Sequence, residues 1–298
     1  MSETPDLAAL LPSWKLSLSA ENKSANTIRT YGESARGFLA WCARQDRPAV
    51  LDRRTVAAFT ASLLAGGAQA ATANIRHRSL RRFSAWLAEE GETASDMLLG
   101  TRPPKLDRKI VPKLTEGDLR LLLKACDGKR LSDRRDEAIV RLAVEAMCRA
   151  EELLCMTVAD VDLHRGIAVI TRGKGGKGRL IPFGPQTARA IDRYLRLRRA
   201  HALAATPAMW LGERGKGLHY AGLYSGLRRR AESAGITGFH PHRLRHTGAS
   251  RWLDAGGSEG GLMAVAGWSS REMLARYVED TAAERAAAES RKLGLGNI

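Results

Sequence analysis

Six residues in the second half of the chain have side chains suited to attack on a phosphodiester: Arg149, Lys174, His242, Arg245, Trp268 and Tyr277. A phenol can act as the nucleophile, guanidinium groups can hold phosphate oxygens, and an imidazole and an amine can move protons. A tyrosine on a late amphipathic helix would by itself indicate packing. Together with the other five residues, Tyr277 is predicted to be a nucleophile. A phenol with a pKa of about 10 attacks phosphorus only with help from bases and cations.

Arg149 and Glu152 lie three residues apart in a segment with a helical pattern, so they share one face of a helix. The apolar run that precedes Arg149 should hold it near the core. A fixed guanidinium at the start of a helix can bind two phosphate oxygens. The alternative is a purely structural ion pair between these two residues.

A glycine-rich turn at 172–179, RGKGGKGR, carries Lys174 and Lys177. It is not a P-loop, because Arg179 stands where that motif has lysine and a strand follows instead of a helix. We expect the tip of a β-hairpin, from which either lysine can reach a minor groove or a leaving group. The alternative is a flexible basic turn.

His242 and Arg245 are also three residues apart, so that a base and a cation share one helical face. His242 and His246 are four apart, a spacing that can bind zinc. The glutamate of the HExxH motif is missing and no cysteine is near, so we expect no metal.

The composition predicts a polyanionic partner. The formal net charge is +16, whereas the fractions of hydrophobic and charged residues, 44% and 27%, are typical of a soluble protein. Such a surplus attracts nucleic acid, although a solvated cationic surface without a specific partner is the alternative.

The cysteines and the N-terminus predict a cytoplasmic protein. Four cysteines without a CxxC pair argue against a disulfide framework and a zinc knuckle. The N-terminus lacks the pattern of a signal peptide, and no apolar stretch has the length of a membrane span.

The first domain, residues 1–90, is predicted to be helical. Ser24 begins one helix, a second runs from Arg54 to Leu64 and ends at Gly66, and a third covers 72–90. In the third helix four apolar residues are expected to point inward: Ile75, Leu80, Phe83 and Leu87. Four arginines are expected to point largely outward, as a surface for DNA phosphates or merely for solvent: Arg76, Arg78, Arg81 and Arg82.

Residues 91–113 are predicted to be a basic linker, because three prolines interrupt helices there and Lys105 and Lys109 add charge. The second domain, 114–298, begins with a capping signature at Thr115 and Asp118. Helical patterns cover 116–126, 133–147, 185–202, 220–234, 242–254, 259–266 and 270–278, with a helical tail at 281–291. Strands are expected at 167–171 and 179–183. The fold class is mainly α with a small β-hairpin, in two domains that form a clamp around DNA.

Several segments resemble the tyrosine recombinase (phage integrase) family, in its Cre- and Xer-like form without an arm-site-binding domain. AMCRAEELLCMTVADVD resembles the first arginine box, TRGKGGKGRLIPF the lysine hairpin, PHRLRHTGAS the H-x-L-R-H-T box and AGWSSREMLARYVE the nucleophile box. SANTIRTYGESARGFLAWC is similar, more weakly, to the core-site-binding domain. Trp268 stands where most members have histidine.

The resemblance implies that Tyr277 forms a 3′-phosphotyrosyl bond while Arg149 and Arg245 hold the phosphate. His242 then acts as base, Lys174 protonates the leaving 5′ oxygen and Trp268 donates its indole N–H. Glu152 orients His242 or Arg149. The residues expected to bind DNA are Arg76, Arg78, Arg81, Arg82, Lys105, Lys109 and Lys177. No cofactor and no metal is implied.

The resemblance further implies a monomer that assembles as a homotetramer on two duplexes at att core sites, with the tail docked on a neighbour. A directionality factor is a further candidate partner. Trp268 favours integration and excision of a phage or mobile element over chromosome-dimer resolution. Two rivals remain: a type IB topoisomerase and a DNA-binding protein without catalysis.

Overall fold

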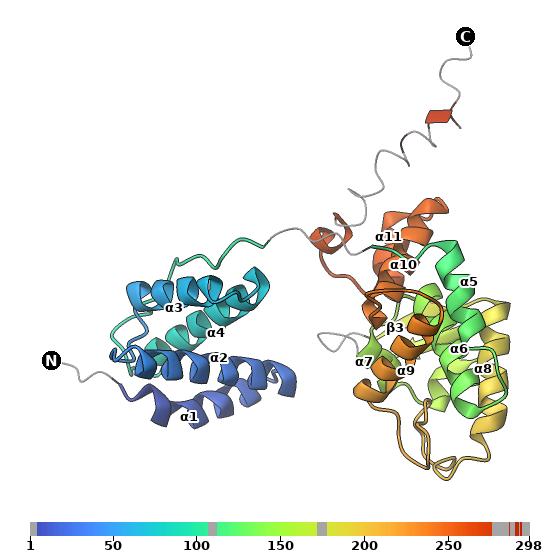
Figure 1. The fold of residues 1–298 in the computed structure, drawn as a ribbon, viewed down its shortest axis with the longest axis horizontal. Helices are drawn as coiled ribbons and strands as arrows, with labels where there is room; N and C mark the ends of the chain where they lie inside the picture. The colour runs from blue at the N-terminus through green and yellow to red at the C-terminus, as the bar shows by residue number, and fades with distance from the viewer. Residues whose placement is uncertain are drawn as a thin grey trace. The chain divides into compact units, whose positions relative to one another are not determined.

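The computed structural model describes residues 5–106, 112–171 and 178–275, together with residues 286, 290, 291 and 293. The chain divides into two compact units, Met1–Lys109 and Ile110–Ile298 (Figure 1). Helices dominate both units, and one small sheet lies in the second, as the fold class predicted. None of the helices in the described ranges combines the length and the apolar character that a membrane crossing needs.

The first unit is built from four helices: α1 (Leu7–Ala20), α2 (Ala25–Arg44), α3 (Arg53–Ala65) and α4 (Ala70–Glu89). The Ser24 side chain accepts a hydrogen bond from the backbone of Thr27, so the expected N-cap is confirmed. Helix α2 packs against both α1 and α4, and α3 packs on α4 (Figure 1). Aromatic side chains fill the space between them, among which the rings of Trp14 and Phe83 are stacked with centroids 4.4 Å apart.

The inward face of α4 is predicted correctly except at one position. Leu80, Phe83 and Leu87 are buried, but Ile75 is 47% exposed. Five residues separate Ile75 from Leu80, which places them about 140° apart around a helix. Ile75 therefore lies beyond the edge of the buried face.

Residues 91–106 pack largely with the first unit. Leu98 is fully buried, and the hydroxyl of Ser84 on α4 donates to Asp96 at 2.6 Å. Asn74 of α4 donates to the carbonyl of Pro104 at 2.8 Å. Most of the first half of the segment that was expected to be a linker is therefore held against the first unit. Burial of Leu98 stabilises this packing, because it removes an apolar side chain from water.

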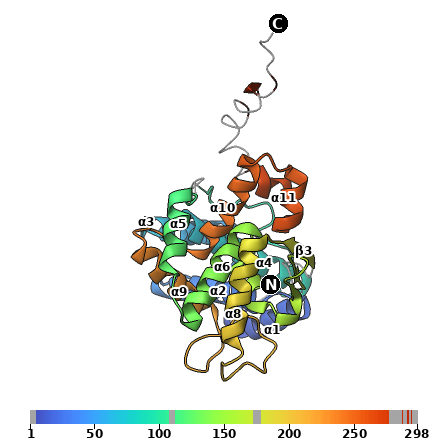
Figure 2. The same cartoon turned by 90° about the vertical axis from the view of Figure 1, so that its right-hand side faces the viewer.

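The second unit contains seven labelled α-helices in its described ranges: α5 (Glu116–Ala125), α6 (Leu131–Glu145), α7 (Ala150–Cys155), α8 (Pro185–Arg198), α9 (Tyr220–Ser233), α10 (Pro241–Asp254) and α11 (Glu259–Ala266). A 3-10 helix, η1, spans Val158–Asp160, and residues 271–275 are helical. Thr115 and Asp118 form the predicted capping box of α5. Helix α6 is almost entirely buried and packs against α8 and α10 (Figure 2).

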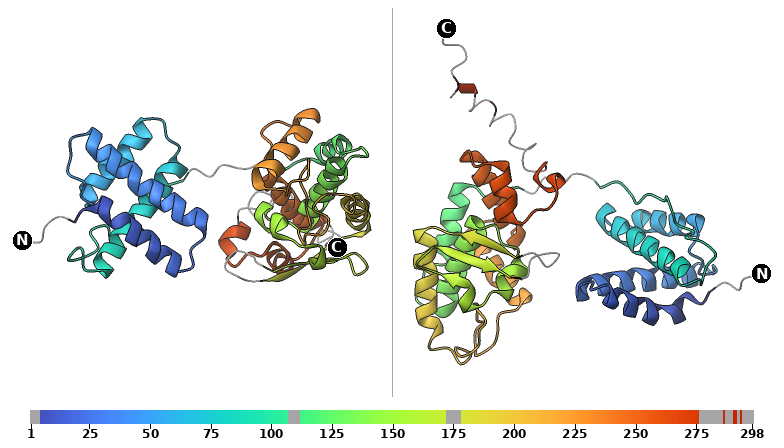
Figure 3. Two further views of the ribbon diagram at one scale, coloured as in Figure 1. Left: turned by 90° about the horizontal axis from the view of Figure 1, so that it is seen from below. Right: turned by 180° about the vertical axis from the view of Figure 1, so that it is seen from behind.

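The sheet has three antiparallel strands in the order β1 (Val161–Asp162), β2 (Ile167–Ile170) and β3 (Arg179–Pro182). Strands β2 and β3 form the predicted hairpin, with Val169 opposite Leu180. Strand β1 was not predicted, because two residues carry no alternating pattern. Figure 3 shows the strands lying against the helices of this unit.

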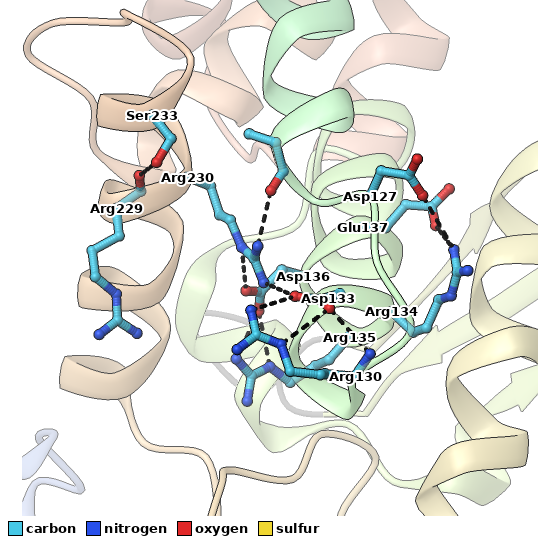
Figure 4. Close-up of polar contacts among 11 residues, drawn as sticks. Asp127, Arg130, Asp133, Arg134, Arg135, Asp136, Glu137, Arg229, Arg230 and Ser233 are labelled. Atoms are coloured by element: carbon cyan, nitrogen blue, oxygen red, sulfur yellow. Dashed lines mark hydrogen bonds and ion pairs between the residues drawn. The ribbon is translucent and has the colours of Figure 1, made fainter.

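A buried ionic network fixes α9 to α6 (Figure 4). Arg230 of α9 donates to Asp133 at 2.6 Å and to Asp136 at 3.1 Å, and it also donates to the carbonyl of Ala125 at the end of α5. Burial tends to raise the pKa of Asp133, but the hydrogen bonds from Arg230 and Arg130 outweigh it and the pKa is lowered. The network holds α9, the helix that precedes α10 in the chain, against α6.

The chain enters the second unit along α10. This entry segment, residues 112–116, is tied to α10 by hydrogen bonds and ion pairs, one of them between Glu116 and Arg251 at 2.9 Å. Arg243 donates to the carbonyl of Pro112 at 3.0 Å, Thr247 accepts from the backbone of Leu114 at 2.9 Å, and Lys113 pairs with Asp254 at 3.1 Å. Leu114 itself is buried.

Candidate active site

The site is organised around the carboxyl end of α11. The carbonyls of three consecutive residues there, Val265, Ala266 and Gly267, accept hydrogen bonds from Arg179, Arg245 and Arg149 respectively. These arginines come from β3, α10 and the start of α7. The last carbonyls of a helix lack intrahelical partners and carry the negative end of its dipole, so they attract cations. We call these three acceptors the α11 carbonyl cluster.

Arg149 is the N-cap residue of α7, with its side chain 25% exposed. Its backbone N–H donates to Glu152 at 2.8 Å and its Nη1 donates to Oε1 of the same carboxylate at 2.6 Å. The bond from Nη2 to Gly267 is long, at 3.3 Å. The ion pair considered for Arg149 and Glu152 therefore exists, and it leaves the guanidinium at the surface.

Glu152 is buried and receives a second arginine. Arg179 donates from Nη1 to Oε1 at 3.0 Å and from Nη2 to Oε2 at 2.7 Å. Burial alone would raise the pKa of Glu152, but the hydrogen bonds from Arg179 and Arg149 lower it to about 2. Glu152 is thus ionised at neutral pH. It contacts Arg149, one of the two partners that the sequence left open.

Arg245 is buried on α10, at 1% exposure. Its Nη1 donates to the carbonyl of Met147 and its Nη2 donates to Ala266 at 2.6 Å. The guanidinium carbon lies 5.4 Å from the centre of the Trp268 ring, a cation–π distance. Trp268 is itself buried and directly follows the α11 carbonyl cluster.

His242 lies in the first turn of α10, one residue after Pro241, and solvent reaches its ring. Packing of the ring against the protein lowers the pKa of His242 and the charge of Arg245 lowers it further. The imidazole is therefore neutral at neutral pH and can accept a proton. Its ring centroid lies 4.7 Å from that of His246, yet the described residues contain no cluster of three His, Cys, Asp or Glu side chains that could hold a metal.

Gly267 is required where the three arginines meet. Its φ of +63° belongs to the left-handed region, and a Cβ there would lie 2.9 Å from Nη1 of Arg179. Only glycine permits both the turn after α11 and the close approach of this guanidinium.

The remaining predicted residues fall outside the described ranges or in the first unit. Tyr277, Lys174, Lys177 and Lys109 lie outside the described residues. Arg76 packs so closely on α2 that a Cβ on Gly37 would lie 3.0 Å from its guanidinium, and Arg82 pairs with Glu21 at 2.9 Å. Arg78 and Lys105 are exposed, and Arg81 is half-buried.

Arg179 was missed as a site residue. In the sequence it is the first residue of a strand after a basic turn, and its side chain would ordinarily be assigned to the hairpin. The useful signal was the turn itself, because a hairpin that is predicted to place a lysine at a site should also bring the residues at its base close to that site.

These groups are suited to binding an anion: arginines from separate elements, a neutral imidazole and an indole lie in one helical domain. Residues 112–284 match the model of the phage integrase family, and residues 11–91 match the model of the phage integrase N-terminal SAM-like domain. The chain therefore belongs to the phage integrase family of tyrosine recombinases, whose members cleave and rejoin DNA through a phosphotyrosine intermediate.

Two curated relatives are tyrosine recombinases named XerD. The protein of Corynebacterium glutamicum is 29% identical over 286 residues, which cover 92% of this chain and 94% of the relative. The protein of Mycobacterium leprae is 35% identical over 198 residues, but this match covers only 63% of this chain and 61% of the relative.

Solved structures share the fold. The Tn1549 transposon integrase in complex with transposon right end DNA has a TM-score of 0.77 at 16% identity, with 96% of this chain and 99% of that chain covered. The XerH site-specific recombinase bound to a palindromic difH substrate has a TM-score of 0.71 at 19% identity, with 91% and 81% covered.

Proposed function

We propose that this protein is a site-specific DNA recombinase that cleaves and rejoins strands by transesterification, with Tyr277 as the nucleophile. The observation that carries the proposal is the meeting of Arg149 and Arg245 at the end of α11, next to Trp268. The nucleophile segment follows this helix in the chain, nine residues after the tryptophan.

In the proposed reaction the phenolic oxygen of Tyr277 attacks the scissile phosphate. A phosphotyrosyl bond forms at the 3′ end, and the bond to the 5′ oxygen breaks. His242, neutral at the working pH, accepts the phenolic proton, and Lys174 supplies a proton to the leaving oxygen. One phosphodiester replaces another, so the 5′-hydroxyl of a partner strand can reverse the step without an external energy source.

Arg149 and Arg245 are proposed to stabilise the charge that accumulates on the non-bridging oxygens. Arg149 suits direct contact, since its side chain is partly exposed and its bond to Gly267 is long enough to be exchanged for a phosphate oxygen. The indole N–H of Trp268 is proposed to donate to the same phosphate. Glu152 holds Arg149 in place.

Duplex DNA is the proposed partner, with phosphates bound by the exposed residues Arg78 and Lys105 and by Arg76, Arg81, Arg82, Lys109 and Lys177. The net charge of +16 supports this partner. Arg82 shares its charge with Glu21 and is expected to contribute less than Arg78. Loss of one phosphate contact, as in Arg78→Ala, should lower the salt slope of log affinity by about 1.

Covalent trapping tests the central claim. The protein is incubated with a library of nicked duplexes that carry a randomised core, and DNA that remains attached after denaturation is sequenced. The wild type should enrich one site, whereas Tyr277→Phe should bind that site without forming an adduct. An adduct that survives in Tyr277→Phe would identify another nucleophile, and binding without any adduct would make the protein a non-catalytic binder.

The biological role is proposed to be integration and excision of a phage or mobile element at att sites, on the basis of Trp268. A Xer-type role in resolving chromosome dimers is the second candidate, because a relative that matches nearly the whole chain is named XerD. The trapped sequence decides between them: a match to the flanks of the gene itself supports integration, and a match to one chromosomal locus elsewhere supports the second role.

A tetramer on two duplexes is proposed for strand exchange, with the tail after Tyr277 docked on a neighbour. Deletion of that tail should leave binding of one site intact and prevent assembly of two sites, as measured by analytical ultracentrifugation. Relaxation of a supercoiled plasmid that lacks the trapped site would instead support a monomeric topoisomerase. Lys174→Ala should slow cleavage more than Lys177→Ala; the reverse order would transfer the acid role to Lys177.

A further inference from the structure

Arg179 is firmly anchored at the base of the hairpin. Its side chain is only 10% exposed, and each of its three side-chain nitrogens donates to a protein acceptor. Two of the bonds bracket the carboxylate of Glu152, and the third, from Nε to the carbonyl of Val265, measures 2.8 Å. Arg179 thereby joins the base of the hairpin to α7 and to α11.

Arg149 and Arg179 share one oxygen of Glu152. Oε1 accepts from Nη1 of Arg149 at 2.6 Å and from Nη1 of Arg179 at 3.0 Å. The charges of the three groups are two positive and one negative, so the trio carries one net positive charge. Since Arg179 is buried and Arg149 is partly exposed, the surplus charge faces solvent through Arg149.

Without Arg179, this balance would change. A buried carboxylate needs a cationic partner, because an unpaired charge in the protein interior is costly. Arg149 would then be the remaining partner of Glu152 within the trio, and the pair would be neutral. A phosphate that approaches Arg149 would then be repelled by the carboxylate of Glu152, and the neutral pair would have no net positive charge to offset this repulsion.

We propose that Arg179 is a positioning residue that neutralises Glu152, so that the guanidinium of Arg149 keeps its charge for the scissile phosphate. The inference rests on the proposed function for the identity of the anion. It assigns the effect to charge compensation rather than to packing, and these two explanations predict different results when Glu152 is also changed.

The first test is single-turnover cleavage of the nicked duplex selected by trapping. Arg179→Gln should cleave about 10- to 100-fold more slowly than the wild type, less than the 10²–10³ that loss of a direct donor costs. Glu152→Gln added to this variant removes the carboxylate that would otherwise neutralise Arg149 and should restore the rate at least about tenfold, a coupling usual between contacting residues. Arg179→Lys keeps the charge and should lie between Arg179→Gln and the wild type.

Arg165→Gln is the matched control, because Arg165 is exposed on the turn between β1 and β2 and its loss changes the net charge equally. It should cleave within about twofold of the wild type. Urea unfolding of every variant establishes that the rates belong to folded protein. A double variant that is as slow as Arg179→Gln, or slower, would overturn the inference in favour of packing.

The second test needs no catalysis. Inorganic phosphate is titrated and its binding is followed by the shift of the unfolding temperature. Arg179→Gln should bind phosphate about tenfold more weakly than Arg165→Gln, and Glu152→Gln should restore the affinity. If the wild type forms no adduct with DNA, the proposed function fails and the phosphate series still decides the role of Arg179. Equal affinities across this series would contradict the inference alone.

Discussion

The pH dependence of stability offers a direct test of how Glu152 is held. Its pKa is lowered from an ordinary 4.5 to about 2, chiefly because the arginine hydrogen bonds outweigh the cost of burial. At about 1.4 kcal/mol for each tenfold change in an acid constant, this corresponds to about 3 kcal/mol of stability at neutral pH. The side chain is 4% exposed, so solvent screens the interaction little.

The sign follows from the lowered pKa. The unfolded chain binds a proton at Glu152 more readily than the folded protein does. The stabilisation is therefore fully present above about pH 4.5 and is lost as the pH falls toward 2. By pH 3, about 2 kcal/mol of it should have disappeared.

Glu152→Gln removes this titration. Urea unfolding at pH 7 and at pH 3 gives the free energy of unfolding of both proteins, and other carboxylates cancel in the difference between them. The difference in the free energy of unfolding between the wild type and the variant should change by about 2 kcal/mol between pH 7 and pH 3, because the wild type loses more stability. Glu151→Gln, on the same turn of α7 but exposed, controls for the loss of one acidic group. A difference independent of pH would refute the charged, arginine-bound state of Glu152.

Three further outcomes are expected. Gly267→Ala should destabilise the protein by about 1 kcal/mol more than Gly238→Ala, because both positions have positive φ but only Gly267 lies against a guanidinium, and thermal unfolding measures the gap. Gly248→Ala places a Cβ against a carbonyl of α6 and should lower the free energy of unfolding by about 2 kcal/mol or more. Gly260→Ala places its Cβ in open space and should stabilise α11 by about 0.5 kcal/mol. Equal effects of the two substitutions would contradict the packing of α10 on α6. A thiol reagent should label Cys155 rapidly in the native protein and the other three cysteines only after unfolding, since they are buried and their thiol pKa values are raised.

Local sequence signals predicted the helices well. Capping residues such as Ser24 and Thr115 act on their own first turn, and the bounds of α11 at 259–266 agree with the pattern. The hairpin was also predictable, because short apolar runs flank a glycine-rich turn. The exposure of Ile75 and the existence of strand β1 were not predictable. Ile75 lies at the edge of a helical face, and β1 is too short to show a sequence pattern.

The site was predictable in its residue types but not in its connections. Arg149, His242 and Arg245 are recognisable by their spacing. The role of Arg179 depends on contacts with α7 and α11 that lie 27 and 86 residues away in the chain. From the sequence, an ion pair of Arg149 with Glu152 and phosphate binding by Arg149 were alternatives. The two roles are compatible in the proposal, because Glu152 is shared with Arg179 and Arg149 keeps its positive charge.

The attachment of residues 112–116 to α10 has a mechanical consequence. Tension on the polypeptide upstream of Pro112 is delivered first to Arg243 and Thr247, which lie between His242 and the middle of that helix. Force applied there acts on α10, the helix that carries the imidazole of His242 and the buried guanidinium of Arg245. We therefore expect a displacement of residues 112–114 to be passed on to α10, and with it to His242 and Arg245, because these hydrogen bonds join the segment to that helix.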